Sequence, residues 1–200
     1  MGLISNGTTI FDAGVIGTSF KGNMTFLSKQ TASSSSTISF TSGIDSTYKE
    51  YIFQFVSLHP SSADPSGITF QGSTDGGSSY GINITSSYFR ATHDESGSNA
   101  AVAYQASQDL AQSTNFQNVA QSTGNDNDQA LSGFLHIFNP SSTTFVKHFL
   151  ARTNNAHQAD KSRDVFTGGY FNTTSAINAF QFKMADGNID AGTIILYGVL

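Results

Sequence analysis

The segment YIFQFVSL, residues 51–58, decides the fold class of this chain. Apolar side chains fall on both faces of the segment, and only Gln54 and Ser57 interrupt them. An apolar, aromatic-rich run of this length is typical of a strand in the interior of a sheet, where both faces are covered. His59 and Pro60 follow it, and proline ends such a strand because it cannot donate to the hydrogen-bond ladder.

Strand patterns continue on both sides of this segment, and no stretch has the sustained periodicity of a convincing helix. Residues 97–128 are predicted as long loops with short strands, because their alanine and glutamine content follows no regular period. The remaining predicted strands cover residues 24–28, 37–40, 68–71, 80–85, 131–138, 145–152, 165–171, 177–184 and 193–200.

Turn sequences predict which of these strands are neighbours. A glycine-rich turn at 75–77 predicts a hairpin over residues 68–84. The sequence NPSSTT at 139–144 predicts a second hairpin, because Asn-Pro and serine favour turns. A third turn, ADGNIDAG at 185–192, joins the last two strands of the chain.

Composition limits the classes of function. The chain has 200 residues, 17 Phe, no Trp and no Cys, and a formal net charge of −5. Only 12% of the residues are charged, and the isoelectric point is about 5.3. The absence of cysteine excludes disulfides, thiolate metal sites and a cysteine nucleophile. The acidic balance argues against nucleic acid as a partner, and no apolar run is long enough for membrane insertion.

Together these features predict an all-β protein. About ten strands of five to eight residues with short turns describe an antiparallel two-sheet, jelly-roll-like sandwich with an N-terminal extended arm. Residues 1–22 are glycine-rich and show little alternation, so they are interpreted as the arm, a possible docking segment. Residues 23–200 are predicted to form a single β-sandwich domain.

The acidic residues do not predict catalysis. The chain has two glutamates, Glu50 and Glu95, and its aspartates fall mostly in turns, as Asp75 does. An aspartate in a turn more often accepts hydrogen bonds from the backbone than acts as an acid catalyst. The segment at 125–128 resembles the start of a calcium loop, but the glycine at loop position six and the glutamate at position twelve are missing. No nucleophile elbow and no phosphate-binding loop occurs.

The five histidines do not predict a metal site. A hairpin that pairs Phe138 with Phe145 places His136 and His148 on opposite faces of the sheet, so the two rings would not share an ion. The other histidines, His59, His93 and His157, are predicted to lie in loops. We therefore expect no catalytic, cofactor-binding or metal-binding residue, no cofactor, and no enzymatic activity.

Four segments resemble small virion surface proteins of tailed bacteriophages, a group abundant in aquatic phages. The most specific part of the likeness is the C-terminal strand–turn–strand, which is similar to the closing hairpin of phage surface and fibre-tip domains. The segments are GLISNGTTIFDAG at 2–14, TGNDNDQ at 123–129, FNPSSTTFVKHF at 138–149 and FNTTSAINAFQFKMADGNIDAGTIILYGVL at 171–200.

This resemblance implies a non-enzymatic structural protein on the particle exterior, located in the virion and assembled in the host cytoplasm. Capsid decoration is favoured, because the chain has at most a short arm where a fibre needs a shaft. The alternative is a tail-fibre or tail-tip knob that binds a host-surface receptor or glycan. Threefold symmetry, common in phage appendages, implies a homotrimer that contacts other virion proteins. The arm at 1–22 either docks on those proteins or forms an edge strand of its own sandwich.

Overall fold

The structure is a computed structural model that describes residues 3–12, 15–16, 23–63 and 67–200. These residues form strands and loops, and none of them lies in a helix long and apolar enough to cross a membrane. The strands are β1 (Leu3–Ser5), β2 (Thr8–Asp12), β3 (Val15–Ile16), β4 (Met24–Thr31), β5 (Ile38–Phe40), β6 (Glu50–Pro60), β7 (Ile68–Ser73), β8 (Ile84–Asp94), β9 (Ala100–Tyr104), β10 (Gln117–Asn118), β11 (Leu131–Phe138), β12 (Lys147–His157), β13 (Lys161–Phe171), β14 (Ala179–Met184) and β15 (Ile189–Val199).

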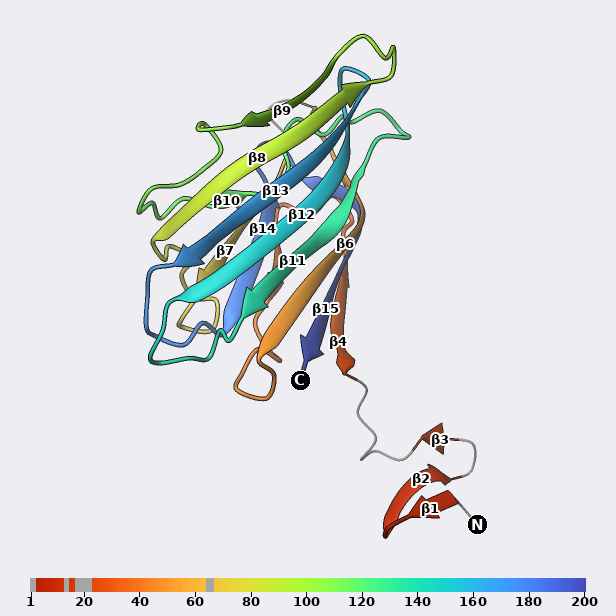
Figure 1. Ribbon diagram of the computed structural model, residues 1–200, viewed down its shortest axis with the longest axis vertical. Helices are drawn as coiled ribbons and strands as arrows, with labels where there is room; N and C mark the ends of the chain where they lie inside the picture. Colours follow the sequence, from red (N-terminus) through yellow and green to blue (C-terminus); the bar gives the residue numbers. More distant parts are fainter. Residues whose placement is uncertain (1–2, 13–14, 17–22, 64–66) are drawn as a thin grey trace.

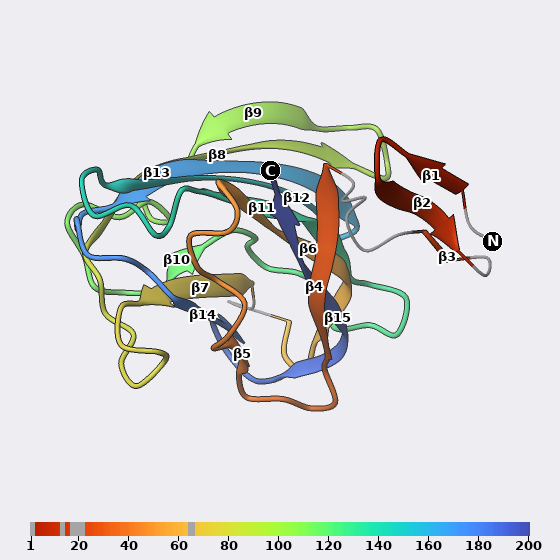
Figure 2. The same ribbon diagram turned by 90° about the horizontal axis from the view of Figure 1, so that it is seen from below.

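Two antiparallel sheets of unequal size form a sandwich, which confirms the predicted all-β class. The larger sheet has eight strands in the order β4-β15-β6-β11-β12-β13-β8-β9, and the smaller has four in the order β10-β7-β14-β5. Figure 1 shows the large sheet in front, and Figure 2 shows β7, β14 and β10 beneath it. The jelly-roll order is not confirmed by this eight-over-four arrangement.

Phenylalanine fills the space between the sheets. Phe53 of β6 points inward, and its ring centroid lies 5.2 Å from Phe40, 5.3 Å from Phe180 and 5.0 Å from Phe182 on the small sheet. Edge-to-face pairs of this kind add to the stabilisation from apolar burial. The predicted position of 51–58 in the interior of a sheet is confirmed, because β6 lies between β15 and β11.

Two of the predicted hairpins are wrong. β7 belongs to the small sheet and β8 to the large one, and the same separation holds for β14 and β15. In each case the chain turns at the expected residues but crosses to the opposite sheet. All six residues of β7 are buried, and β7 pairs with β14 and β10, whereas β8 pairs with β13 and β9.

The hairpin of β11 and β12 exists, but in a different register from the predicted one. His136 lies opposite Leu150, not Lys147. The connection is longer than predicted, because Ser142 Oγ accepts hydrogen bonds from the Thr144 and Phe145 backbone N–H groups and keeps these residues in the turn. The odd register shift brings His136 and His148 to the same, outer face, so the predicted opposite placement is wrong.

The N-terminal residues form strands of their own. β1, β2 and β3 pair in that order as a three-stranded antiparallel sheet, where the sequence predicted an extended arm. Residues 1–2, 13–14 and 17–22 of the predicted arm lie outside the described residues. Residues 97–128 contain only the short strands β9 and β10, as predicted.

Candidate functional site

The face of the large sheet that points away from the small sheet is unusually apolar. Side chains alternate along each strand, so β12 buries Phe149 and Ala151 and exposes Leu150 and Arg152. Large apolar side chains with at least two-fifths of their surface exposed occur on this outer face from one edge of the sheet to the other. They are Met24, Phe26, Val56, Phe89, Val102, Tyr104, Phe134 and Leu150.

Five of the outer side chains form a row across five neighbouring strands. The strand register places Phe134, Arg152, Phe166, Phe89 and Tyr104 opposite one another in that order. The rings of Phe166 and Phe89 are stacked, with centroids 5.0 Å apart and an angle of 3° between their planes. Arg152 Cζ lies 4.7 Å from the centroid of Phe166, which is a cation–π distance. The row is therefore a continuous ladder of planar groups.

Asp164 holds the guanidinium of this row in place. Arg152 Nε donates to Asp164 Oδ1 at 3.1 Å, and Nη2 donates to Oδ2 at 2.7 Å. This two-point contact fixes the orientation of the guanidinium plane. The hydrogen bonds that Arg152 donates to Asp164 raise the pKa of Arg152 above its ordinary value. Arg152 is more than half exposed, so it remains accessible to a partner.

A groove of about 420 Å³ runs beside the ladder. Its floor includes Gly168 of β13, where an added Cβ would lie 3.2 Å from Leu150 Cδ2 and would narrow the groove. His136 lines the opposite wall and is hydrogen-bonded through Nδ1 to Glu50. The His136 ring also packs edge-to-face on Phe134, with the two ring centroids 5.3 Å apart. The groove is mainly aromatic and has polar groups at its rim.

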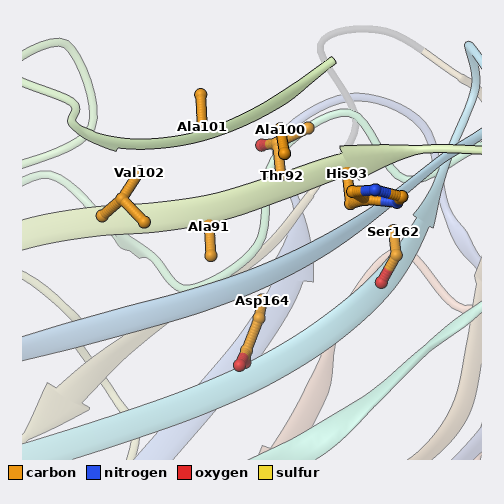
Figure 3. Close-up of a pocket in the computed structure, with 8 residues that line it drawn as sticks. All are labelled: Ala91, Thr92, His93, Ala100, Ala101, Val102, Ser162 and Asp164. Atoms are coloured by element: carbon orange, nitrogen blue, oxygen red, sulfur yellow. The ribbon is translucent and has the colours of Figure 1, made fainter. Parts of the chain in front are cut away.

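A second hollow, of about 460 Å³, lies at the β9 end of the same face. Figure 3 shows Ala91, Val102 and Asp164 on adjacent strands, with His93 close to Ser162. Small side chains of β8 and β9 leave this space open. Asp164 of the hollow is hydrogen-bonded to Arg152 of the groove, so the groove and the hollow adjoin each other on the outer face.

Three histidines that were predicted in loops lie in strands instead. His59 belongs to β6, His93 to β8 and His157 to β12. His59 Nδ1 lies 3.9 Å from Asp190 Oδ2, and its Nε2 lies 3.1 Å from the Asp126 carbonyl oxygen. No group of three or more histidine or acidic side chains suited to a metal occurs within residues 3–12, 15–16, 23–63 and 67–200.

The turn aspartate Asp75 stabilises the backbone, as its sequence context predicted. Its Oδ1 accepts hydrogen bonds from Ser73 Oγ at 2.6 Å and from the Ser79 backbone N–H at 3.0 Å, and its Oδ2 accepts one from Ser79 Oγ at 2.6 Å. These hydrogen bonds, first those from the Ser73 and Ser79 side chains, hold the pKa of Asp75 far below its usual value. The carboxylate thus shapes the connection between the two sheets.

The fold and the outer face define a class: an antiparallel β-sandwich with one sheet face covered by its own core and the other left apolar and open. No protein-family model, no curated protein and no solved structure matches this chain. What the chain does must therefore be inferred from its sequence and from the geometry of this face.

Proposed function

We propose that this chain is a non-enzymatic structural protein on the outside of a bacteriophage particle, most simply a capsid decoration protein. The observation that carries the proposal is the apolar outer face, which extends from Phe26 on β4 to Tyr104 on β9. Clusters of large exposed apolar side chains on a folded domain mark interaction surfaces. The proposed role is contact with other virion proteins and with further copies in a homotrimer.

The chemistry of the outer face supports a contact role. Aromatic residues and arginine are enriched in the centres of protein interfaces, and lysine and acidic residues are depleted there. The ladder of Phe134, Arg152, Phe166, Phe89 and Tyr104 has this composition, and the carboxylate beside it, Asp164, is already paired with Arg152. A partner that covers the ladder therefore buries no unpaired charge in this row.

The test is a reconstruction of the intact particle by electron cryo-microscopy, with mass spectrometry of the purified particles. We expect the sandwich in regular copies on the capsid, with the outer face against another protein. Density confined to the tail tip would overturn the decoration role, and absence of the chain from purified particles would overturn the virion role altogether.

Two variants test whether incorporation depends on the outer face or on any exposed apolar side chain. Phe134→Ser removes an exposed ring from the ladder, whereas Phe145→Ser removes an even more exposed ring from the loop before β12. We expect the first substitution to reduce incorporation into particles at least about 10-fold, because central aromatic side chains dominate interface energies. The second is expected to leave incorporation unchanged.

The second candidate is a tail knob that binds a host-surface glycan, and a separate observation favours it. Sugar hydroxyls need polar groups beside an apolar surface, and the groove has Arg152, whose guanidinium is paired with Asp164, together with the Phe166 and Phe89 rings. Arg152→Ala would then abolish binding to host cells. It would leave assembly of the particle intact, the reverse of the result expected for Phe134→Ser under the decoration role.

A further inference from the structure

The open edges of the two sheets differ in how well they are protected against pairing with a further strand. The small sheet ends in β10 and β5, which are two and three residues long. At one edge of the large sheet, β4 carries Lys29 and pairs with β15 through an irregular register. Short strands, charges and bulges are the features that keep sheet edges from pairing. β9, the other edge, has five residues, AAVAY, with no charge, no proline and a regular register with β8.

The backbone of β9 presents hydrogen-bonding groups at this edge that do not pair with β8, although the Tyr104 carbonyl also accepts a hydrogen bond from Gln105 Nε2 at 3.1 Å. The Gln105 N–H donates to the Tyr88 carbonyl at 2.9 Å, and the Asn99 carbonyl accepts from the Asp94 N–H at 3.1 Å. In an antiparallel strand the backbone groups of alternate residues point to opposite sides. The odd-numbered residues of β9 therefore face β8, and Ala100, Val102 and Tyr104 direct their N–H and C=O groups away from the sheet.

Side chains leave this edge accessible as well. Val102 is 76% exposed and Tyr104 is 56% exposed, and β9 lies at the rim of the sandwich in both Figure 1 and Figure 2. The residues on either side of Val102, Ala101 and Ala103, are small. At the centre of β9, these three side chains therefore place no charge and no bulky group at the edge.

We propose that β9 pairs antiparallel with β9 of a second copy of this chain, about a two-fold axis at Val102. This register places Val102 opposite Val102, Ala100 opposite Tyr104, and Ala101 opposite Ala103. It engages all five residues, and the outward backbone groups of Ala100, Val102 and Tyr104 form roughly six hydrogen bonds between the copies. Each copy uses the same surface, which is the geometry of a closed dimer.

A second copy fits this edge better than an unrelated peptide. The strand is self-complementary in side-chain size, since the small Ala100 meets the large Tyr104 at both ends of the pairing. A two-fold axis perpendicular to the sheet also keeps the two outer faces on the same side, so Tyr104 and Phe89 of both copies join one apolar surface. The contact does not depend on the virion role, and it is compatible with a three-fold assembly through another surface.

Single cysteines test the pairing directly, because the chain contains no cysteine of its own. We expect Val102→Cys to form disulfide-linked dimers under mild oxidation, since paired strands bring Cα atoms to about 5.5 Å, within disulfide range. The matched control is Gln30→Cys, at an exposed site on the protected β4 edge. A Val102→Cys chain that stays monomeric, or that cross-links no faster than the control, would overturn the proposal.

Mixed cross-linking tests the register. A mixture of Ala100→Cys and Tyr104→Cys chains is expected to give mainly the mixed dimer, because the proposed axis places these positions opposite each other. Two homodimers in equal or greater yield would contradict the axis at Val102.

Sedimentation of the full chain provides a measurement without cysteines. Val102→Lys places two like charges opposite each other and is expected to lower the association constant at least about 10-fold. Gln30→Lys is expected to leave it unchanged. Equal association of Val102→Lys and the wild-type chain would overturn the proposal, and a partner peptide of another protein would then be the better candidate for this edge.

Discussion

The two faces of the large sheet have similar side chains and different surroundings. On the inner face, Phe53 contacts three rings of the small sheet and is fully buried. On the outer face, Phe89 stacks on Phe166 of the adjacent strand and remains 42% exposed. Apolar content therefore does not distinguish a core face from a contact face. The distinction is whether another layer of the same chain covers the rings.

This comparison has an energetic consequence. Burial of a phenylalanine side chain contributes about 1.5–3 kcal/mol, and deletion of a core ring also leaves a cavity. On the outer face the same deletion leaves no cavity, because solvent already reaches the ring. Substitutions on the two faces should separate folding from binding.

The largest effect is expected on the inner face. Phe53→Ala should lower the free energy of unfolding by about 3–5 kcal/mol, because the ring has no exposed surface and three aromatic neighbours. Urea unfolding followed by circular dichroism measures this loss. Phe134→Ala, its counterpart on the outer face, should cost less than about 1 kcal/mol. Equal losses for the two variants would show that the outer face is part of the folding core.

A buried cation at one end of the inner face gives the next effect. Lys147 is fully buried, and its Nζ donates to the carbonyl oxygens of Phe145 and Thr173, each at 3.0 Å. Lys147→Met keeps most of the length of the side chain and removes both hydrogen bonds. We expect it to lower the free energy of unfolding at pH 7 by about 1–3 kcal/mol, because two carbonyl groups lose their partner. An unchanged denaturation midpoint would contradict this role.

The same lysine predicts a pH dependence. Burial lowers the pKa of Lys147 in the folded chain below its unfolded value. Between these two pKa values the unfolded chain binds more protons, so the free energy of unfolding increases with pH. The stability difference between the wild-type chain and Lys147→Met should therefore widen as the pH rises toward about 10. A difference that stays constant or narrows over this range would contradict the prediction.

The sequence predicted strands better than it predicted their partners. The apolar run at 51–58 was identified as an interior strand because both of its faces are apolar, and β6 confirms it. The turn at 75–77 was also identified, whereas the turn predicted at 185–192 is confirmed only up to residue 188, because β15 begins at Ile189. A turn sequence specifies that the chain reverses, however, and not which sheet receives it. The crossings from β7 to β8 and from β14 to β15 depend on contacts with strands far away in the chain.

The outer face was missed, although the sequence contains a signal for it. β11, β12 and β13 each have adjacent apolar residues, Phe134-Leu135, Phe149-Leu150 and Val165-Phe166, which must point to opposite faces. Three such pairs on neighbouring strands predict a sheet with two apolar faces. The prediction that His136 and His148 lie on opposite faces was wrong for a different reason. The predicted register of β11 and β12 was off by an odd number of residues, and such an error assigns every side chain of one strand to the wrong face.

A smaller effect is expected for the stacked rings of the outer face. A double-mutant cycle with Phe89→Ala and Phe166→Ala isolates their mutual contribution to stability. We expect a coupling energy of about 0.5–1 kcal/mol, since stacked aromatic pairs contribute this much beyond their burial. Chemical denaturation of the four proteins measures it. A coupling energy near zero would mean that the ladder serves binding alone.

The smallest effect is expected for the ion pair at the centre of the outer face. Asp164→Asn removes the carboxylate that orients Arg152, yet Arg152 is more than half exposed and its charge is solvated. Exposed ion pairs contribute little to folding, so the free energy of unfolding should fall by less than about 1 kcal/mol, and by less again at high salt. Recognition by a partner, in contrast, requires the fixed guanidinium plane. The same substitution should therefore lower the affinity for the particle by a larger free energy than it lowers the free energy of unfolding. A loss of stability above about 2 kcal/mol with unchanged docking would assign Arg152 to the core and remove the outer face as a contact surface.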